Sequence, residues 1–148
     1  MIGKIKYAPG TFASVFACIL FFLLTQIFSY TTILIILIVL FLYSFYAINN
    51  SFDEFDTEDP QEIVIDEVFG QMLTLLAIPI YETLYPLPAL YYYISALIFF
   101  RLFDIWKPYP INFVDNNVKG AFGIMIDDII ASFYSILILI IIFFFVGG

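Results

Sequence analysis

Residues 101–128, RLFDIWKPYPINFVDNNVKGAFGIMIDD, separate two strongly apolar segments and decide how the chain is interpreted. This stretch contains seven charged side chains: Arg101, Asp104, Lys107, Asp115, Lys119, Asp127 and Asp128. Because ionisable groups beside lipid-length helices are energetically costly, they indicate a functional site by default. The stretch therefore predicts membrane helices on both sides and a site between them.

The composition places the whole chain in the membrane class. Hydrophobic residues make up 64% of the 148 residues and charged residues only 12%. The mean hydropathy of +1.05 also lies outside the range of soluble globular proteins. The length is enough for one domain, which we expect to cover residues 1–148. The net charge of −8 argues against a nucleic-acid partner, which would need a basic surface.

Two chemically versatile side chains are scarce in this chain. There is no histidine, which removes the commonest general base and the commonest metal ligand. The single cysteine, Cys18, lies in an apolar run. No disulfide framework is therefore expected, and the thiol is expected to be structural and unreactive.

Apolar segments predict an all-α, multi-pass membrane bundle of about five helices. Their expected ranges are Phe12–Phe28, Ile33–Ile48, Ile63–Tyr81, about Leu87–Leu102, and Gly123–Val146. The first two have about 17 residues each, which is the lower limit for a span. The short break at Ser29–Thr32 between them predicts an antiparallel hairpin. Asp66 and Glu67 shorten the apolar length of the third segment, so it either spans the membrane or lies shallow.

The longer connections differ in character. Asn49–Glu62 is acidic and is expected to face water, and its Asp59-Pro60 dipeptide is typical of a helix start. The loop Lys107–Gly120 contains two prolines, which are expected to break any helix.

The basic residues predict the orientation of the bundle. With the N-terminus in the cytoplasm, all five fall on the cytoplasmic face: Lys4, Lys6, Arg101, Lys107 and Lys119. This is the asymmetry described by the positive-inside rule. The same topology brings four polar clusters to that face: Pro9–Thr11, Asp66 with Glu67, Arg101–Lys107, and Asp127 with Asp128. Convergence of distant segments at one membrane surface is typical of an active site.

Two acidic pairs near expected helix N-termini, Asp66-Glu67 and Asp127-Asp128, are candidate metal ligands. Facing pairs would repel each other unless protonation, a basic side chain or a cation offsets the charge. Oxygen-only ligands suit Mg²⁺, which binds one or two carboxylates together with waters and substrate phosphate. The alternative is that these carboxylates only form ion pairs with the basic residues of 101–128.

The remaining candidates would bind phosphate. Arg101 and Asp104 share a helix face, where they either form a simple salt bridge or present Arg101 to a phosphate. Lys107 follows just past the expected helix end, where it suits a phosphate contact. Gly10 and Thr11 form a helix-entry turn in which Thr11 can cap the helix and N–H groups could bind an anion.

Three motifs occur in a characteristic order and spacing over most of the chain. They are PGTF-S at residues 9–14, EIVIDEVFGQ at 62–71, and FRLFDIWKPYPI at 100–111 followed by KG and FGIMIDDIIA up to residue 131. Together they resemble the phosphatidylglycerophosphatase A family. The resemblance implies a bacterial membrane enzyme. With the multi-pass topology inferred above, we expect it in the bacterial inner (cytoplasmic) membrane with its active site facing the cytoplasm. It implies Mg²⁺-dependent removal of the phosphate of phosphatidylglycerophosphate, giving phosphatidylglycerol.

The family motif maps onto particular positions of this chain. These are Thr11, Asp66, Glu67, Gly70, Arg101, Asp104, Lys107, Asp115, Gly123, Asp127 and Asp128. Ala13, Ala121 and Ser132 depart from the family pattern, each by exchanging one small residue for another. The departures affect the turns rather than the chemistry.

Elimination agrees with the resemblance. A histidine-based phosphatase is impossible, Cys18 lacks the basic exposed loop of a cysteine-based one, and the DxDx[TV] motif of haloacid-dehalogenase-type phosphatases is absent. Metal-assisted attack by water remains. The expected metal ligands are Asp66, Glu67, Asp104, Asp127 and Asp128. The expected catalytic carboxylates are Asp66, Glu67, Asp127 and Asp128, any of which could be the base. The expected phosphate-binding residues are Arg101, Lys107 and Thr11.

Two other functions fit parts of this pattern. A CDP-alcohol phosphotransferase also uses membrane carboxylates and a divalent metal, but its D-x2-D-G-x2-A-R…G-x3-D-x3-D signature is missing. A small transporter or ion-conducting protein needs polar groups through the whole membrane depth, whereas here they stop at one face. The oligomeric state and the number of metal ions stay open.

Overall fold

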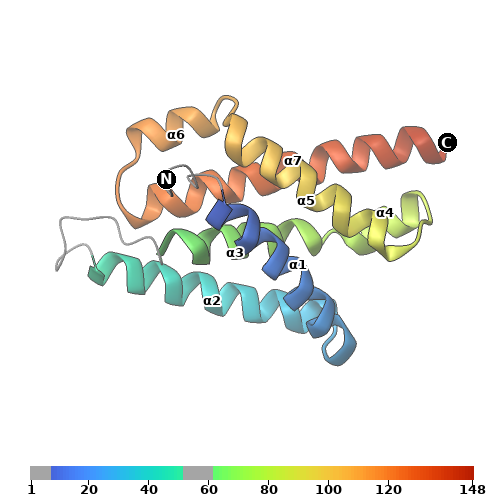
Figure 1. Cartoon of the computed structure of the whole chain (residues 1–148), viewed down its shortest axis with the longest axis horizontal. Coiled ribbons are helices and arrows are strands. Elements are labelled where there is room, and N and C mark those ends of the chain that lie inside the picture. The colour runs from blue at the N-terminus through green and yellow to red at the C-terminus, as the bar shows by residue number, and fades with distance from the viewer. Residues whose placement is uncertain (1–7, 52–61) are drawn as a thin grey trace, which may run out of the picture.

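The structure, a computed structural model, describes residues 8–51 and 62–148, and within these ranges helices are joined by short connections without strands. The helices are α1 (Ala8–Ile27), α2 (Tyr30–Ser51), α3 (Glu62–Leu75), α4 (Ile78–Leu84), α5 (Ala89–Trp106), α6 (Ile111–Asn117) and α7 (Ala121–Gly147). Figure 1 shows them as one elongated bundle, so the predicted all-α fold is confirmed. The helix start predicted at Asp59-Pro60 lies outside the described residues, and α3 begins at Glu62.

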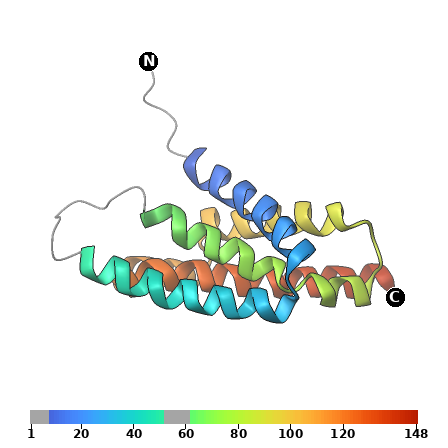
Figure 2. The same cartoon turned by 90° about the horizontal axis from the view of Figure 1, so that it is seen from below.

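The chain reverses direction between α1 and α2, as predicted, but the two helices diverge from the turn instead of packing along their length as an antiparallel hairpin, and α1 packs on α3 (Figures 1 and 2). The hydroxyl of Ser29 accepts a hydrogen bond from the backbone N–H of Thr32 at 3.3 Å. This bond is an N-terminal cap, which satisfies one of the free donors at the start of a helix. The cap explains why α2 begins at Tyr30, before the apolar run itself starts.

The third predicted segment is wrong as a single helix, because it consists of α3 and α4 with a break at Leu76 and Ala77. Pro79, in the first turn of α4, has no N–H to donate to the preceding turn, so α3 cannot continue through it. With 14 residues, α3 is about 21 Å long at 1.5 Å per residue. A hydrocarbon core of about 30 Å is longer than that, so α3 alone is too short to cross it, and α4 continues the segment to the opposite end of the bundle (Figure 1).

The expectation of no helix in Lys107–Gly120 is also wrong, because α6 occupies part of this range. Pro110 stands at the N-cap position of α6, and Lys107 with a φ of 48° ends α5 in the left-handed conformation. A proline just before a helix or in its first turn does not interrupt helical hydrogen bonds. The backbone N–H groups at these positions have no acceptor within the helix, so the N–H that proline lacks is not needed. The prolines therefore separate two helices instead of excluding one.

Three helices in the described residues are long and apolar enough to span a membrane: Gly10–Ile27, Ala89–Trp106 and Phe122–Gly147. Tyr30–Tyr46 forms a shorter apolar stretch. Large apolar side chains face outward; Phe12, Trp106 and Phe145 are 73%, 68% and 76% exposed. Such an apolar exterior marks a surface that contacts lipid.

α7 is the central element of the bundle and packs against α3, α5 and α6 (Figures 1 and 2). Near its C-terminus, the ring of Phe143 lies 5.4 Å from that of Tyr81 and 5.5 Å from that of Tyr92. The hydroxyl of Tyr92 donates to the carbonyl oxygen of Tyr85 at 2.6 Å, which fixes the turn before α5. This aromatic end holds α4, α5 and α7 together, while the polar residues gather at the other end of α7.

Candidate active site

A cavity of about 570 Å³ lies where α3, α5, α6 and α7 meet. It is lined by Asp66, Glu67, Asp104, Lys107, Asp115, Asn116, Val118, Lys119, Gly120, Gly123, Ile124, Asp127 and Asp128. The structure thus brings all of the predicted metal ligands, and Lys107, to one cavity. Helices that are far apart in the sequence converge on it at one end of the bundle, which is the arrangement that an active site needs.

Lys107 connects the end of α5 to α6 and α7. Its Nζ atom lies 2.6 Å from Oδ1 of Asp115 and 3.1 Å from Oδ2 of Asp127. Burial alone would lower the pKa of this ammonium, but the hydrogen bonds and charges of the two aspartates outweigh burial and raise the pKa above its ordinary value. Lys107 therefore stays positively charged inside the cavity.

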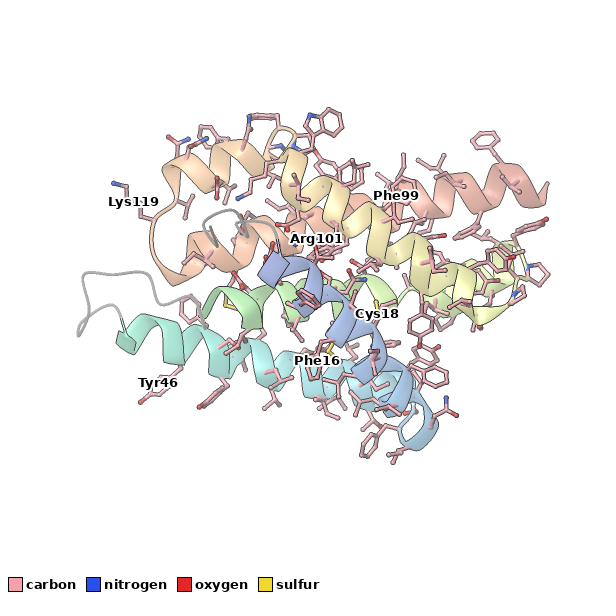
Figure 3. The ribbon with its side chains drawn as sticks, viewed as in Figure 1. Phe16, Cys18, Tyr46, Phe99, Arg101 and Lys119 are labelled. Carbon is pink, nitrogen blue, oxygen red and sulfur yellow. The ribbon has the colours of Figure 1, made fainter. Side chains whose placement is uncertain are left out.

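Arg101 forms a second charged group with Glu67 and Asp104. Its guanidinium pairs with Asp104 one turn along α5 and lies 3.5 Å from Oε1 of Glu67. Figure 3 shows Arg101 in the interior of the bundle, near α1 and α3. Within the described part of the chain, Nε of Arg101 and Oε2 of Glu67 are buried without a hydrogen-bond partner. Both atoms therefore keep a free bonding position, which buried polar groups seldom do without a ligand or water.

α1 reaches this charged group through Gly10. A Cβ atom at this position would come within 2.8 and 2.9 Å of the terminal nitrogen atoms of Arg101, and closer still to Oε1 of Glu67. Glycine lets α1 approach so closely without displacing the ends of these two side chains. Because α1 begins at Ala8, Thr11 lies within the first turn, and the capping position predicted for it is wrong.

Gly70 gives α3 its close contact with α5 and α7. A Cβ atom there would lie 2.8 Å from ring carbons of Phe100 and 3.2 Å from Cβ of Asp128. The hydroxyl of Ser132 lies 2.7 Å from the carbonyl oxygen of Gly70 and 2.8 Å from that of Asp128. Ser132, one of the departures from the family motif, thereby adds a link between α3 and α7 beside the acidic pairs.

The two acidic pairs share a local geometry. Oδ1 of Asp66 accepts the backbone N–H of Glu67, and Oδ1 of Asp127 accepts that of Asp128, both at 3.0 Å. Asp66, Asp127 and Asp128 are only 4%, 7% and 3% exposed. Each pair thus holds one carboxylate in a fixed orientation at the cavity, largely shielded from water.

Burial changes the titration of the pair on α3. It raises the pKa of Asp66 to about 8; the N–H of Glu67 opposes the increase, and the charges of Glu67 and Asp127 add to it. Burial also raises the pKa of Glu67, against the opposing charge of Arg101. Perturbed carboxylates in a cavity are typical of functional sites.

The residues that line the cavity suit a hard cation that is only partly coordinated by the protein. Within residues 8–51 and 62–148, no three acidic or cysteine side chains form a ready-made metal cluster. The available donors are carboxylate oxygens from α3, α5 and α7, and Oε2 of Glu67 is buried without a partner among the described residues. Mg²⁺ needs only one or two carboxylates, with water and substrate phosphate in the other positions. The residues fit Mg²⁺ held in that way, and they do not fit a closed protein cage.

The lining differs from the predicted phosphate-binding set. Arg101 is not part of it but contacts Glu67 and Asp104, which are. Thr11 is exposed in the first turn of α1 and does not line the cavity either. Conversely, Asn116 and Lys119 line the cavity, although neither was predicted as a site residue. Lys119 is the lysine of the KG motif, whereas Asn116 had no signal beyond its position inside the charged stretch; neither signal separates a lining residue from a surface residue.

Known proteins match this chain over nearly its whole length. The family model of phosphatidylglycerophosphatase A matches residues 1–143. The phosphatidylglycerophosphatase A of Haemophilus influenzae is 34% identical over 136 residues, which cover 92% of this chain and 79% of that protein. The phosphatidylglycerophosphatase A of Escherichia coli is 34% identical over 138 residues, which cover 90% of this chain and 73% of that protein.

A protein of Bacteroides thetaiotaomicron, provisionally named a phosphatidylinositol-3-phosphatase, is 34% identical over 140 residues, which cover 93% of this chain and 84% of that protein. No solved structure matches the chain. The family match includes every residue that lines the cavity. The chain therefore belongs to the phosphatidylglycerophosphatase A family.

Proposed function

We propose that this protein hydrolyses the phosphomonoester of phosphatidylglycerophosphate, releasing phosphatidylglycerol and phosphate, with Mg²⁺ as its cofactor. Family membership supports the reaction. The observation that carries the proposal is the cavity of buried carboxylates at one end of membrane-length helices. A polar headgroup lies at that depth when its acyl chains lie in the bilayer beside α5 and α7.

Lys107 is the proposed phosphate-binding residue in the cavity. An entering phosphate would compete with Asp115 for the Lys107 ammonium. The side chain of Asp115 is 43% exposed and can be rehydrated, whereas the side chain of Asp127 is 10% exposed and stays in place. Arg101 is a positioning residue, because its guanidinium orients Glu67 and Asp104 at the cavity.

Asp127 and Asp128, with Asp66 or Glu67, are the residues proposed to hold the cation. When bound, Mg²⁺ polarises the phosphoryl oxygens and offsets their charge. A remaining carboxylate accepts the proton of the attacking water. Asp66 suits this role because burial raises its pKa to about 8, and a general base works best with a pKa near the operating pH.

We further propose that the cavity faces the cytoplasm at the bacterial inner membrane. Arg101, Lys107 and Lys119 all lie at the cavity end of the bundle, which supports this orientation under the positive-inside rule. The relatives that carry the phosphatidylglycerophosphatase A name are bacterial. Apart from Glu82 on α4, the charged residues that line the cavity or pair beside it gather at this end of the described bundle rather than through its depth, which gives a transport path little support.

The test is phosphate release by the purified protein in detergent micelles. Phosphatidylglycerophosphate with Mg²⁺ should be hydrolysed, and a chelator should stop the reaction. Phosphatidylinositol 3-phosphate serves as the comparison lipid, because the name of the Bacteroides relative points to it. Hydrolysis of that lipid alone would contradict the substrate proposed here.

Two variants locate the chemistry. Asp127→Asn and Asp128→Asn should each lose most activity while the protein stays membrane-inserted. Glu82→Gln, at an exposed carboxylate on α4, is the matched control and should be as active as the wild type. Near-normal turnover in both aspartate variants would remove these residues from the site.

A further inference from the structure

The charges that line the cavity are unbalanced. It has six carboxylates, those of Asp66, Glu67, Asp104, Asp115, Asp127 and Asp128, against two lysines, Lys107 and Lys119. A phosphate dianion that approaches this lining meets repulsion unless a cation is available to it. Phosphate binding therefore depends on a basic group that the acids of the site do not already engage.

Lys107 and Arg101 are both engaged. The Lys107 ammonium lies within hydrogen-bond distance of Asp115 and Asp127, and the Arg101 guanidinium pairs with Glu67 and Asp104. Lys119, by contrast, lines the cavity and is exposed, and it has no acidic partner among the described residues. Figure 3 shows its side chain extending from the α6–α7 connection away from the helices.

Two glycines hold the backbone that presents Lys119. Gly120 has a φ of 84°, a backbone conformation that residues other than glycine rarely adopt. Gly123 packs so closely on Val118 that a Cβ atom would collide with the Val118 carbonyl group. The turn between α6 and α7 is thereby tightened, and its middle residue lies at the rim of the cavity.

We propose that Lys119 is a substrate-binding residue that captures the phosphate group of the headgroup at the rim of the cavity. The inference rests on the proposed function, because it names a residue of that same site. A solvated lysine on a flexible stem attracts an anion from a distance and can follow it inward. Lys119 therefore acts on substrate capture, while Lys107 and the buried carboxylates act on the reaction.

The first experiment separates binding from turnover. Lys119→Gln should raise the KM for phosphatidylglycerophosphate about tenfold, and kcat should stay within about twofold of the wild type. Lys119→Arg, made in the wild-type chain, should keep the wild-type KM, because it keeps the positive charge. A loss of kcat at constant KM, or an unchanged KM, would overturn the proposal.

The second experiment moves the cation. Asn116, in the last turn of α6, lines the cavity, whereas its neighbour Asn117 does not, although both are exposed. Asn116→Lys in the Lys119→Gln background should lower the raised KM most of the way back to the wild-type value. Asn117→Lys in the same background restores the same net charge and should recover little. Equal recovery by both would show that only the net surface charge matters.

A binding measurement distinguishes this inference from the proposed function. Glycerol 3-phosphate, a soluble phosphomonoester, is titrated into the micelle-embedded protein by calorimetry. Its affinity should fall about tenfold in Lys119→Gln, whether or not the protein turns over the lipid. Lys119-dependent binding without hydrolysis of phosphatidylglycerophosphate would contradict the proposed function alone. Equal affinity in both proteins would contradict the role of Lys119 alone.

Discussion

The Nζ atom of Lys107 lies 3.1 Å from Oδ2 of Asp127, although the two residues are separated by the whole of α6. The contact joins the end of α5 to the second turn of α7 and closes the cavity on one side. Asp127 is 10% exposed in its side chain. A carboxylate at that depth is stable as an anion only while a cation stays beside it.

Removing the cation should therefore destabilise the bundle. Lys107→Met leaves Asp127 without its partner and should lower the free energy of unfolding by about 2 kcal/mol, a value reduced because Lys107 is itself part-exposed. The measurement is thermal unfolding in micelles followed by circular dichroism. Adding Asp127→Asn to the same chain should restore most of the loss, since the only carboxylate then left without its lysine is Asp115, whose side chain is 43% exposed. Purely additive effects would contradict the coupling.

Gly10 should matter for activity more than for stability. Gly10→Ala places a methyl group against the ends of Glu67 and Arg101, which are flexible and can move aside. The protein should fold with an unchanged unfolding temperature. Turnover should fall at least about tenfold, because the displaced Arg101 no longer holds Glu67 in its position at the cavity. Val15→Ala, at an exposed position of α1, is the control and should leave both quantities unchanged. Full activity of Gly10→Ala would show that this group has no part in the reaction.

Gly70 should show the opposite balance. A methyl group there meets the buried ring of Phe100 and Cβ of Asp128, neither of which has room to move. Gly70→Ala should cost about 2 kcal/mol of stability, the typical penalty of overpacking. Phe100→Leu in the same chain removes the ring and should recover part of that loss. If the double variant is less stable than Gly70→Ala alone, the clash with the Phe100 ring does not cause the loss of stability.

The sequence predicted the meeting of Asp66 with Asp127 and Asp128 for two reasons. Charged residues stand out in an apolar chain, and counting the membrane crossings assigns each connection to one membrane face. It predicted the break between α3 and α4 poorly, because the run from Leu75 to Tyr81 is apolar throughout and hides Pro79. Hydrophobicity indicates that a segment is buried in lipid or protein, but it does not indicate where a helix ends inside such a run.

The details of the cavity depend on contacts that no local pattern encodes. The left-handed backbone of Lys107 and the presence of α6 bring Asp115 back to the Lys107 ammonium. Neither feature follows from two prolines, which are compatible with a loop or with a helix start. The rim position of Lys119 depends on the turn between α6 and α7, so its place in the KG motif could not by itself put it at the cavity.

Cation binding should appear in stability as well as in turnover. Asp128 is 3% exposed and lies beside the charges of Asp66, Asp104 and Asp127, so a divalent cation that joins them offsets their repulsion in the folded state only. With Mg²⁺ at about 100 times its Kd, the folded protein should gain about 2.7 kcal/mol, seen as a higher unfolding temperature in micelles without any substrate. Asp128→Asn keeps the size of the side chain and removes its charge. It should therefore unfold no earlier than the wild type in a chelator, and gain much less from Mg²⁺. An equal Mg²⁺ shift in the two proteins, with Glu82→Gln as the charge control, would mean that the cation binds elsewhere.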